Sequence, residues 1–329
     1  MYHSIGSPEL WAGFILFVLA MLALDLGVFH RKAHAVGWRE ALVWSLVWVA
    51  LALLFSAGVW WSYGPQRGLE FLTGYLIEKS LSVDNIFVFV VIFSALGIPA
   101  NYQHRVLFWG ILSALVLRGV MIFAGAAMLA RFHWLIYVFG AFLVLTGVKL
   151  FFERGKQSHP EESRAMVVVR RLIPSTDKLH AHHFFVRLGG KLLATPLFMA
   201  LVMVEITDVV FAVDSIPAIF AITNDTFIVF TSNIFAILGL RSLFFLLAGF
   251  VDRFRYLKVG LAAVLVFVGA KMGAVDLYKV PALVSLCVIT LILGASIVAS
   301  LLVSRRAGPL CADSDTEESA RKSVARKVV

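Results

Sequence analysis

Two apolar stretches of the chain contain clusters of oxygen-bearing side chains. The first reads EKSLSVDNIFVF, from residue 78, and the second reads EITDVVFAVDSIPAI, from residue 205. Carboxylate, amide and hydroxyl oxygens suit Mn²⁺, Mg²⁺ or Ca²⁺, whereas Zn²⁺ and Cu(I) favour sites with His or Cys. The stretches therefore predict an oxygen-ligand cation site, and its candidate metal ligands are Glu78, Asp84, Asn85, Glu205, Asp208, Asp214 and Ser215.

Helical spacing places part of each cluster on one face. Glu78, Ser82 and Asn85 are spaced at i, i+4 and i+7, so they lie on one side of a helix. Asp208 and Ser215 have the same spacing as Glu78 and Asn85, and they share the matching face of the second helix. The two stretches thus predict two polar helix faces of similar design.

The remaining aspartates need a distortion or more helices to reach the same centre. Asp84 and Asp214 lie about 120° around an ideal helix from those faces. Pro217 cannot donate a backbone hydrogen bond to the Val213 carbonyl, and its ring pushes that carbonyl aside. We therefore predict that Pro217 distorts the second helix and frees a backbone oxygen next to Asp214. The first stretch has Phe87 at the equivalent position.

The elements that carry these side chains must be membrane-spanning helices. Hydrophobic residues make up 60% of the chain and charged residues 15%, with a mean hydropathy of +0.90, whereas a soluble domain has about 25% charged residues. The predicted fold class is all-α, a polytopic transmembrane helical bundle within residues 1–304. It has nine apolar segments of spanning length, at roughly 9–29, 40–62, 69–97, 106–130, 133–152, 193–222, 226–250, 257–275 and 280–303.

The distribution of Lys and Arg predicts the orientation in the membrane. Most of the 29 basic residues fall on one side, and the connections on the other side hold only Arg67, Arg131 and Lys279. The positive-inside rule then places the N-terminus outside, and the 153–192 loop and the C-terminus in the cytosol. The net charge of +9 is mainly a topology signal, so nucleic acid is not an expected partner. The polar tail, 305–329, is predicted to be disordered.

The sequence repeats itself once. LSVDNIF at 81–87 resembles FAVDSIP at 211–217, LVLRG at 115–119 resembles LGLRS at 238–242, and LVLTGVKL at 143–150 resembles LVFVGAKM at 265–272. The predicted repeats are three-helix units, 69–152 and 193–275, joined by the 153–192 loop. An odd number of helices per unit makes the units antiparallel in the membrane, as in alternating-access transporters. The alignment pairs Glu78 with Asp208, Asp84 with Asp214, Arg118 with Arg241 and Lys149 with Lys271.

Charged side chains within the spans are costly unless they face protein, water or an ion. Translocon scales give about 2.5–3.5 kcal/mol for one unpaired charge at the centre of a helix. The intramembrane bases are predicted to pair with the acids or to couple charge movement, and they are Lys79, Arg118, Lys149, Arg241 and Lys271. One alternative is that these pairs are only structural salt bridges, although buried pairs are poor stabilisers. A combined hypothesis is that the bases neutralise the empty site and release when metal binds.

Two further features carry weaker signals. The 153–192 loop contains His180, His182 and His183, which could bind a metal on the cytosolic side, or the loop is an interfacial helix with a solvated connector. Cys287 lies in an apolar segment and Cys311 in the polar tail. They form no CxxC motif, and this pattern predicts neither a disulfide framework nor direct redox chemistry.

The longest motifs resemble a known family. At EKSLSVDNIFVF, EITDVVFAVDSIPAIFAIT and IPSTDKLHAHHFFV, the chain is similar to the TerC/Alx family of integral membrane proteins. The resemblance covers nearly the whole chain. It implies the wider LysE-type transporter superfamily, manganese export and a bacterial inner membrane, and the family name refers to tellurium resistance. The functional residues that it implies are Glu78, Asp84, Asn85, Asp208, Asp214 and Ser215.

The leading hypothesis is a secondary transporter, not an enzyme, that exports divalent cations, with Mn²⁺ as substrate. The chain has no Walker motif, so a proton or Na⁺ gradient is the expected energy source, and no tightly bound cofactor is expected. A second hypothesis is a tellurite or other oxyanion transporter that uses the intramembrane bases. A third is a non-transporting redox or assembly modulator of the membrane. Besides the lipid bilayer, the expected partners are therefore the cation and its coupling ion.

Overall fold

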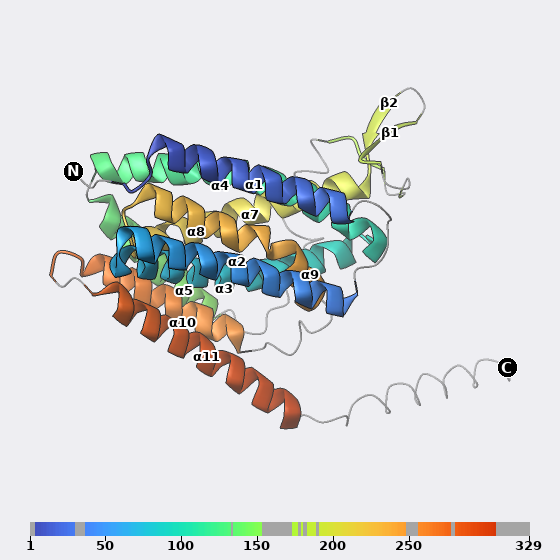
Figure 1. The fold of residues 1–329 in the computed structure, drawn as a ribbon. Helices are drawn as coiled ribbons and strands as arrows, with labels where there is room; N and C mark the ends of the chain where they lie inside the picture. The colour runs from blue at the N-terminus through green and yellow to red at the C-terminus, as the bar shows by residue number, and fades with distance from the viewer. Residues whose placement is uncertain are drawn as a thin grey trace.

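The computed structural model describes residues 4–29, 37–132, 134–152, 173–176, 179, 183–188, 191–247, 256–277 and 280–306. Long helices lie side by side in one bundle, and a small hairpin extends from one end of it (Figure 1). The helices are α1 (Pro8–Phe29), α2 (Trp38–Tyr63), α3 (Pro65–Ala95), α4 (Ala100–Arg131), α5 (Leu135–Phe152), α7 (Pro196–Phe220), α8 (Thr226–Leu238), α9 (Leu240–Leu247), α10 (Leu257–Gly273) and α11 (Ala282–Arg306).

Every predicted apolar segment coincides with a helix, except that the seventh is divided into α8 and α9 at Gly239. Five helices are long and apolar enough to cross a bilayer, and α8 with α9, bent by 40°, makes a sixth if the pair is one span. The all-α class of a membrane protein is therefore confirmed. The count of nine spans stays a prediction.

Local sequence signals explain where the central helices begin. Gly64 has a φ of 90°, a backbone conformation that residues with a Cβ rarely adopt. Pro65 follows in the first turn of α3. Pro196 opens α7 in the same way. Asp225 caps α8 by accepting hydrogen bonds from the backbone N–H groups of Phe227 and Ile228. These signals fix the register of the helices that carry the polar faces.

Helices α3, α4, α7 and α8 pack against one another at the centre of the bundle, and α5 packs against α10 beside them. The α5–α10 contact is unusually close. A Cβ added to Gly140 would lie 2.9 Å from the Gly269 carbonyl oxygen, and one added to Gly269 would lie 2.6 Å from that of Gly140. A Cβ on Gly147 would lie 2.8 Å from the Ala262 carbonyl oxygen. Small residues let the two backbones touch, as in other membrane helix pairs.

We expect Gly269→Ala to destabilise the protein by about 1–3 kcal/mol, because the added methyl group overlaps the backbone of α5. Thermal unfolding of the purified protein in detergent measures the effect. Gly294→Ala in α11 is the matched control, since nothing lies within 4 Å of a Cβ at that position. An equal effect of the two substitutions would contradict the close α5–α10 contact.

The two ends of the bundle differ. Helix α1 begins at the end where α3 also begins, and we call this the outer end because the basic residues predict that it faces outside. The hairpin of β1 (Phe185–Leu188) and β2 (Lys191–Ala194) lies at the opposite end, where α11 also finishes (Figure 1). Most of the predicted cytosolic loop, with His180 and His182, and nearly all of the 305–329 tail lie outside the described residues.

Candidate functional site

Arg118 of α4 stands at the centre of the bundle and joins the two polar helix faces. Its side chain is only 1% exposed. Nε and Nη2 donate to the two carboxylate oxygens of Asp208 on α7, at 3.1 and 2.8 Å. Nη1 donates to Oε1 of Glu78 on α3. The two acids that the repeat alignment pairs are thus held by one guanidinium.

Both acids lie near the middle of their helices. Glu78 is about 20 Å along α3 from its outer end, and Asp208 is about 18 Å along α7 from its outer end, at a rise of 1.5 Å per residue. Each is almost completely buried, with 1% exposure for Glu78 and 3% for Asp208. The site is therefore at the depth expected for the centre of a membrane, with no direct access to water in this conformation.

Asn233 of α8 completes this centre, and sequence reasoning missed it. Its Nδ2 donates to Oε2 of Glu78 at 3.1 Å, and its Oδ1 accepts a longer bond from Arg118 Nη1 at 3.4 Å. The side chain is fully buried. A signal was present, because Asn233 is an amide within a largely apolar segment, but the predicted repeat alignment places Gly110 opposite it.

The charges at this centre are unequal. Glu78 and Asp208 are two carboxylates, and Arg118 is the single base bonded to them among the side chains that the structure describes. Lys79 is next to Glu78 in sequence, but its Nζ instead lies 3.4 Å from the Ala236 carbonyl oxygen on α8. Uncompensated charge in a dry interior is costly. When both carboxylates are ionised, the centre can therefore accept one more positive charge, as a proton or as part of a metal ion.

Several oxygens near these acids in sequence lack hydrogen-bond donors. Ser82 Oγ and Asn85 Oδ1 on α3, and Ser215 Oγ on α7, are buried without a hydrogen-bond partner in the described part of the chain. Buried polar atoms are rarely left unpaired in folded proteins. Such oxygens are suited to bind a cation or a water molecule, and all three lie on the faces predicted to be polar.

The other predicted ligands are more dispersed. Glu205 accepts a hydrogen bond from Ser113 of α4 and is near enough to Asp208 for their charges to interact. Asp214 accepts a hydrogen bond from Thr146 of α5, and the charge of Lys149 is close to it. The side chain of Asp84 lies outside the described residues. Among the side chains that are described, no three of His, Cys, Asp and Glu gather closely enough to hold a metal ion.

The remaining predicted residues have different environments. Arg241 is buried in α9, 4% exposed, and Lys271 of α10 donates to Ser285 of α11 at 2.9 Å. Helix α7 continues through Pro217 to Phe220 as one element, so a distortion at Pro217 stays a prediction. His183 is the one described member of the predicted histidine group. Its backbone carbonyl accepts a hydrogen bond from Thr195.

A helical bundle with buried ion pairs between long apolar helices defines an integral membrane protein, and comparison with known proteins shows which kind. Residues 63–308 match the model of the family described as "Integral membrane protein TerC family". The chain belongs to the TerC family, as its motifs predicted. No solved structure matches the chain.

Several relatives match along almost their whole length. One is 70% identical over 95% of this chain and 98% of its own, and is described as "Uncharacterized membrane protein STKORF319" of Myxococcus xanthus. Another is 49% identical over 92% of this chain and 98% of its own, and is described as "Putative membrane-bound redox modulator Alx" of Escherichia coli K12. A membrane protein of Rickettsia bellii is 43% identical over 89% of this chain.

Proposed function

We propose that this protein transports divalent cations across the membrane and that Glu78 and Asp208 form the centre of its substrate site. The observation that carries the proposal is the unequal charge at this centre, where two buried carboxylates from different helices share the single guanidinium of Arg118. A centre that is only structural gains little from a second acid, because buried ion pairs are weak stabilisers. A centre that must take up and release a cation needs this spare negative charge.

Arg118 is then the resident counter-ion of the empty site. In the described conformation it occupies the position between the carboxylates, and Asn233 holds the other oxygen of Glu78. A divalent cation must displace the guanidinium from at least one carboxylate. The unpaired oxygens of Ser82, Asn85 and Ser215 supply further ligands of the type that Mn²⁺ accepts. Protons or Na⁺ are the proposed coupling ions, because they can replace the metal at the same acids.

Alternating access in this proposal uses two inverted three-helix repeats, α3–α5 and α7–α10. Three observations support it. The aligned acids Glu78 and Asp208 meet at one arginine. The aligned helix pairs, α3 with α7, α4 with α8 and α5 with α10, each pack together. The α5–α10 contacts also exchange under the alignment, since the pair Gly147–Ala262 becomes the pair Gly269–Gly140. Such a relation is typical of transporters with a midplane site.

The identity of the metal and the direction of transport rest on the family resemblance. We propose Mn²⁺ as the substrate and export as the direction, across the bacterial inner membrane. The oxygen ligands are equally compatible with Mg²⁺ and Ca²⁺. Asp84 and Asp214, which the alignment also pairs, are proposed as further ligands or as intermediate binding sites on the path to the centre.

A measurement of cellular manganese tests this function. Cells that lack the protein receive the wild type, Asp84→Ala or Asp214→Ala, and metal content is measured after exposure to Mn²⁺. We expect the wild type to lower intracellular manganese and both variants to lose this effect, because each removes one acid from an apolar span. Glu9→Ala is the matched control, since Glu9 is exposed at the start of α1. If both variants lower intracellular manganese as the wild type does, Asp84 and Asp214 have no role in transport.

A role as a redox modulator is the second candidate, and the printed description of the Escherichia coli relative favours it. This chain has two cysteines, Cys287 and Cys311. A double serine variant separates the two functions: thiol chemistry requires at least one of these residues, whereas cation transport at Glu78 and Asp208 requires neither. An oxyanion transporter would instead show saturable uptake of tellurite that Mn²⁺ does not inhibit.

A further inference from the structure

A pocket of about 400 Å³ opens at the outer end of the bundle, away from the central acids. The N-terminal turn of α3, with Arg67 and Glu70, forms one part of its wall. The turn between α7 and α8, with Thr223 and Asp225, forms a second part. The wall opposite comes from α5 and α10 and includes Lys271. The pocket thus lies where the two proposed repeats meet.

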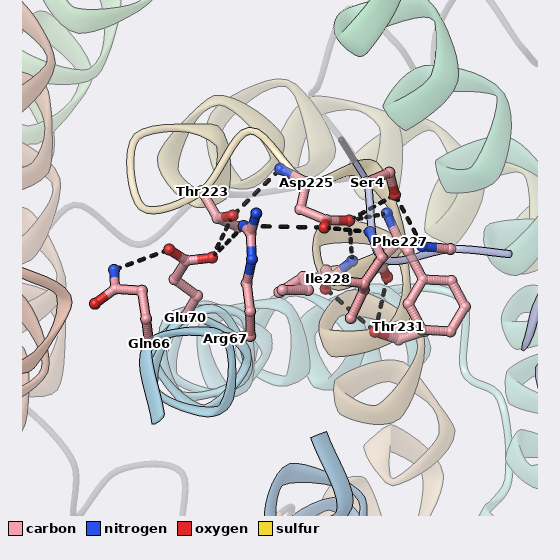
Figure 2. Close-up of polar contacts among 11 residues, drawn as sticks. Ser4, Gln66, Arg67, Glu70, Thr223, Asp225, Phe227, Ile228 and Thr231 are labelled. Carbon is pink, nitrogen blue, oxygen red and sulfur yellow. Dashed lines mark hydrogen bonds and ion pairs between the residues drawn. The ribbon is translucent and has the colours of Figure 1, made fainter. Parts of the chain in front are cut away.

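Arg67 joins the first two walls (Figure 2). Its Nη1 is 2.9 Å from Oε2 of Glu70 on its own helix and 3.9 Å from Oδ2 of Asp225 across the turn. Thr223 strengthens the same link, because its hydroxyl donates to Oε2 of Glu70 at 2.7 Å. The side chain of Arg67 is 30% exposed, whereas the side chains of Glu70 and Asp225 are 9% and 1% exposed. The charged group nearest to water therefore lies over buried acids.

These two acids are already supplied with donors. Glu70 accepts hydrogen bonds from Gln66, Arg67 and Thr223. Asp225 caps α8 and also accepts from Ser4 Oγ and the Ile5 backbone N–H, both at 2.8 Å (Figure 2). Carboxylates so engaged are poor ligands for a second metal ion. Their geometry instead holds three segments together, which are the residues before α1, the start of α3 and the α7–α8 turn.

The facing wall bonds to other partners. Lys271 donates to Ser285 of α11 at 2.9 Å, and Tyr137 at the start of α5 donates to Asp276 beyond α10. These bonds tie α10 to α11 and α5 to the segment after α10, and the charge of Glu70 on the opposite wall also attracts Lys271. The bonds of Arg67 run along the other side of the pocket. In the part of the chain that the structure describes, the polar side-chain contacts that join α3 to the α7–α8 turn are those of Arg67 with Asp225 and of Thr223 with Glu70.

The same helix connects this pocket to the proposed substrate site. Glu70 and Glu78 both lie on α3, eight residues or about 12 Å apart along its axis. In the other proposed repeat, Asp225 likewise lies at the outer end and Asp208 lies deeper in the bundle. We infer that the pocket is the outer vestibule of the transport path, and that Arg67, held by Glu70 and Asp225, is the latch that keeps this end closed. This inference rests on the proposed transport function.

Thiol accessibility tests the latch. Cys287 and Cys311 are replaced by serine, and Met272, which is buried in the pocket wall, by cysteine as a reporter. An uncharged, membrane-impermeant maleimide is applied to right-side-out vesicles, so that the charge of residue 67 does not alter the reagent's approach. We expect Arg67→Gln to increase the labelling rate about tenfold, because it removes the ion pair that joins α3 to the α7–α8 turn. Thr223→Val is a second, milder variant and should change the rate in the same direction.

Arg131→Gln is the matched control, because Arg131 is an exposed arginine at the outer end of α4 with no part in the latch. Equal labelling in Arg67→Gln, Thr223→Val and the control would overturn the latch. Mn²⁺ flux is measured in the same vesicles. If the unmodified protein moves no Mn²⁺, the proposed function fails, and the vestibule with it. If Mn²⁺ moves but labelling is unchanged, only the latch is wrong.

Discussion

Replacement of Arg118 by methionine is expected to lower the free energy of unfolding by about 3–5 kcal/mol, the cost of removing one partner from a buried ion pair. The substitution leaves Glu78 and Asp208 facing each other without a counter-ion in a dry interior, and Asn233 is the only other described side chain bonded to either of them. Thermal unfolding in detergent measures the loss. Methionine keeps much of the volume, so a packing defect contributes little.

A compensating substitution separates this electrostatic effect from simple damage. Asp208→Asn in the Arg118→Met background removes one of the unpaired charges, and we expect it to recover part of the lost stability. Arg131→Met, at the exposed end of α4, is the control and should change stability by less than about 0.5 kcal/mol. If Arg118→Met is as stable as the control, the guanidinium does not neutralise the two acids, and its role as counter-ion is wrong.

The second large effect is expected on metal binding. Glu78→Gln and Asp208→Asn each keep the shape of the side chain but remove the charge, and we expect each to weaken Mn²⁺ binding by at least about 100-fold. Loss of an outer partner of a metal ligand already weakens binding by about 10–100-fold, and loss of a ligand itself costs more. The signal of free Mn²⁺ in electron paramagnetic resonance measures this with purified protein, without any transport assay.

Two further variants serve as controls for this binding measurement. Glu9→Gln, an exposed acid at the start of α1, should bind Mn²⁺ as the wild type does. Glu78→Asp keeps the charge and should retain more affinity than Glu78→Gln. A water molecule can bridge the shortened carboxylate and the ion. Wild-type affinity in both Glu78→Gln and Asp208→Asn would rule out the central site, even if the protein transports manganese by another path.

The sequence predicted much of this architecture because the bilayer limits the choices. Each apolar segment of spanning length is helical, with one divided into α8 and α9, since backbone groups in lipid must bond within their own segment. The pairing of Glu78 with Asp208 was also predictable. The repeat alignment placed these acids at equivalent positions, and the structure joins them through Arg118, a third charge that the same alignment identified.

Other parts of the site depend on tertiary packing, which the patterns of the amino-acid sequence did not predict. The predicted repeat alignment gives Asn233 no polar counterpart, so an argument from that alignment did not identify it. The division between α8 and α9 falls at Gly239, next to Lys79, where a Cβ would lie 2.6 Å from the Lys79 Nζ. Because the end of a lysine side chain can shift, the firmer limit is the Cβ of Trp48 on α2 at 3.2 Å, and only the folded arrangement brings it there. At the outer pocket, Thr223 bonds to Glu70, 153 positions away in sequence, and no local pattern predicted this pair.

The bonds from Ser4 and Ile5 to Asp225 have a practical consequence for handling this protein. Ser4 and Ile5 are bonded to the residue that caps a central helix, so a purification tag or fluorescent protein fused close to them would disturb that cap. The opposite terminus follows α11, whose last turn lies at the other end of the bundle (Figure 1). Fusions intended to leave the protein active belong at the C-terminus.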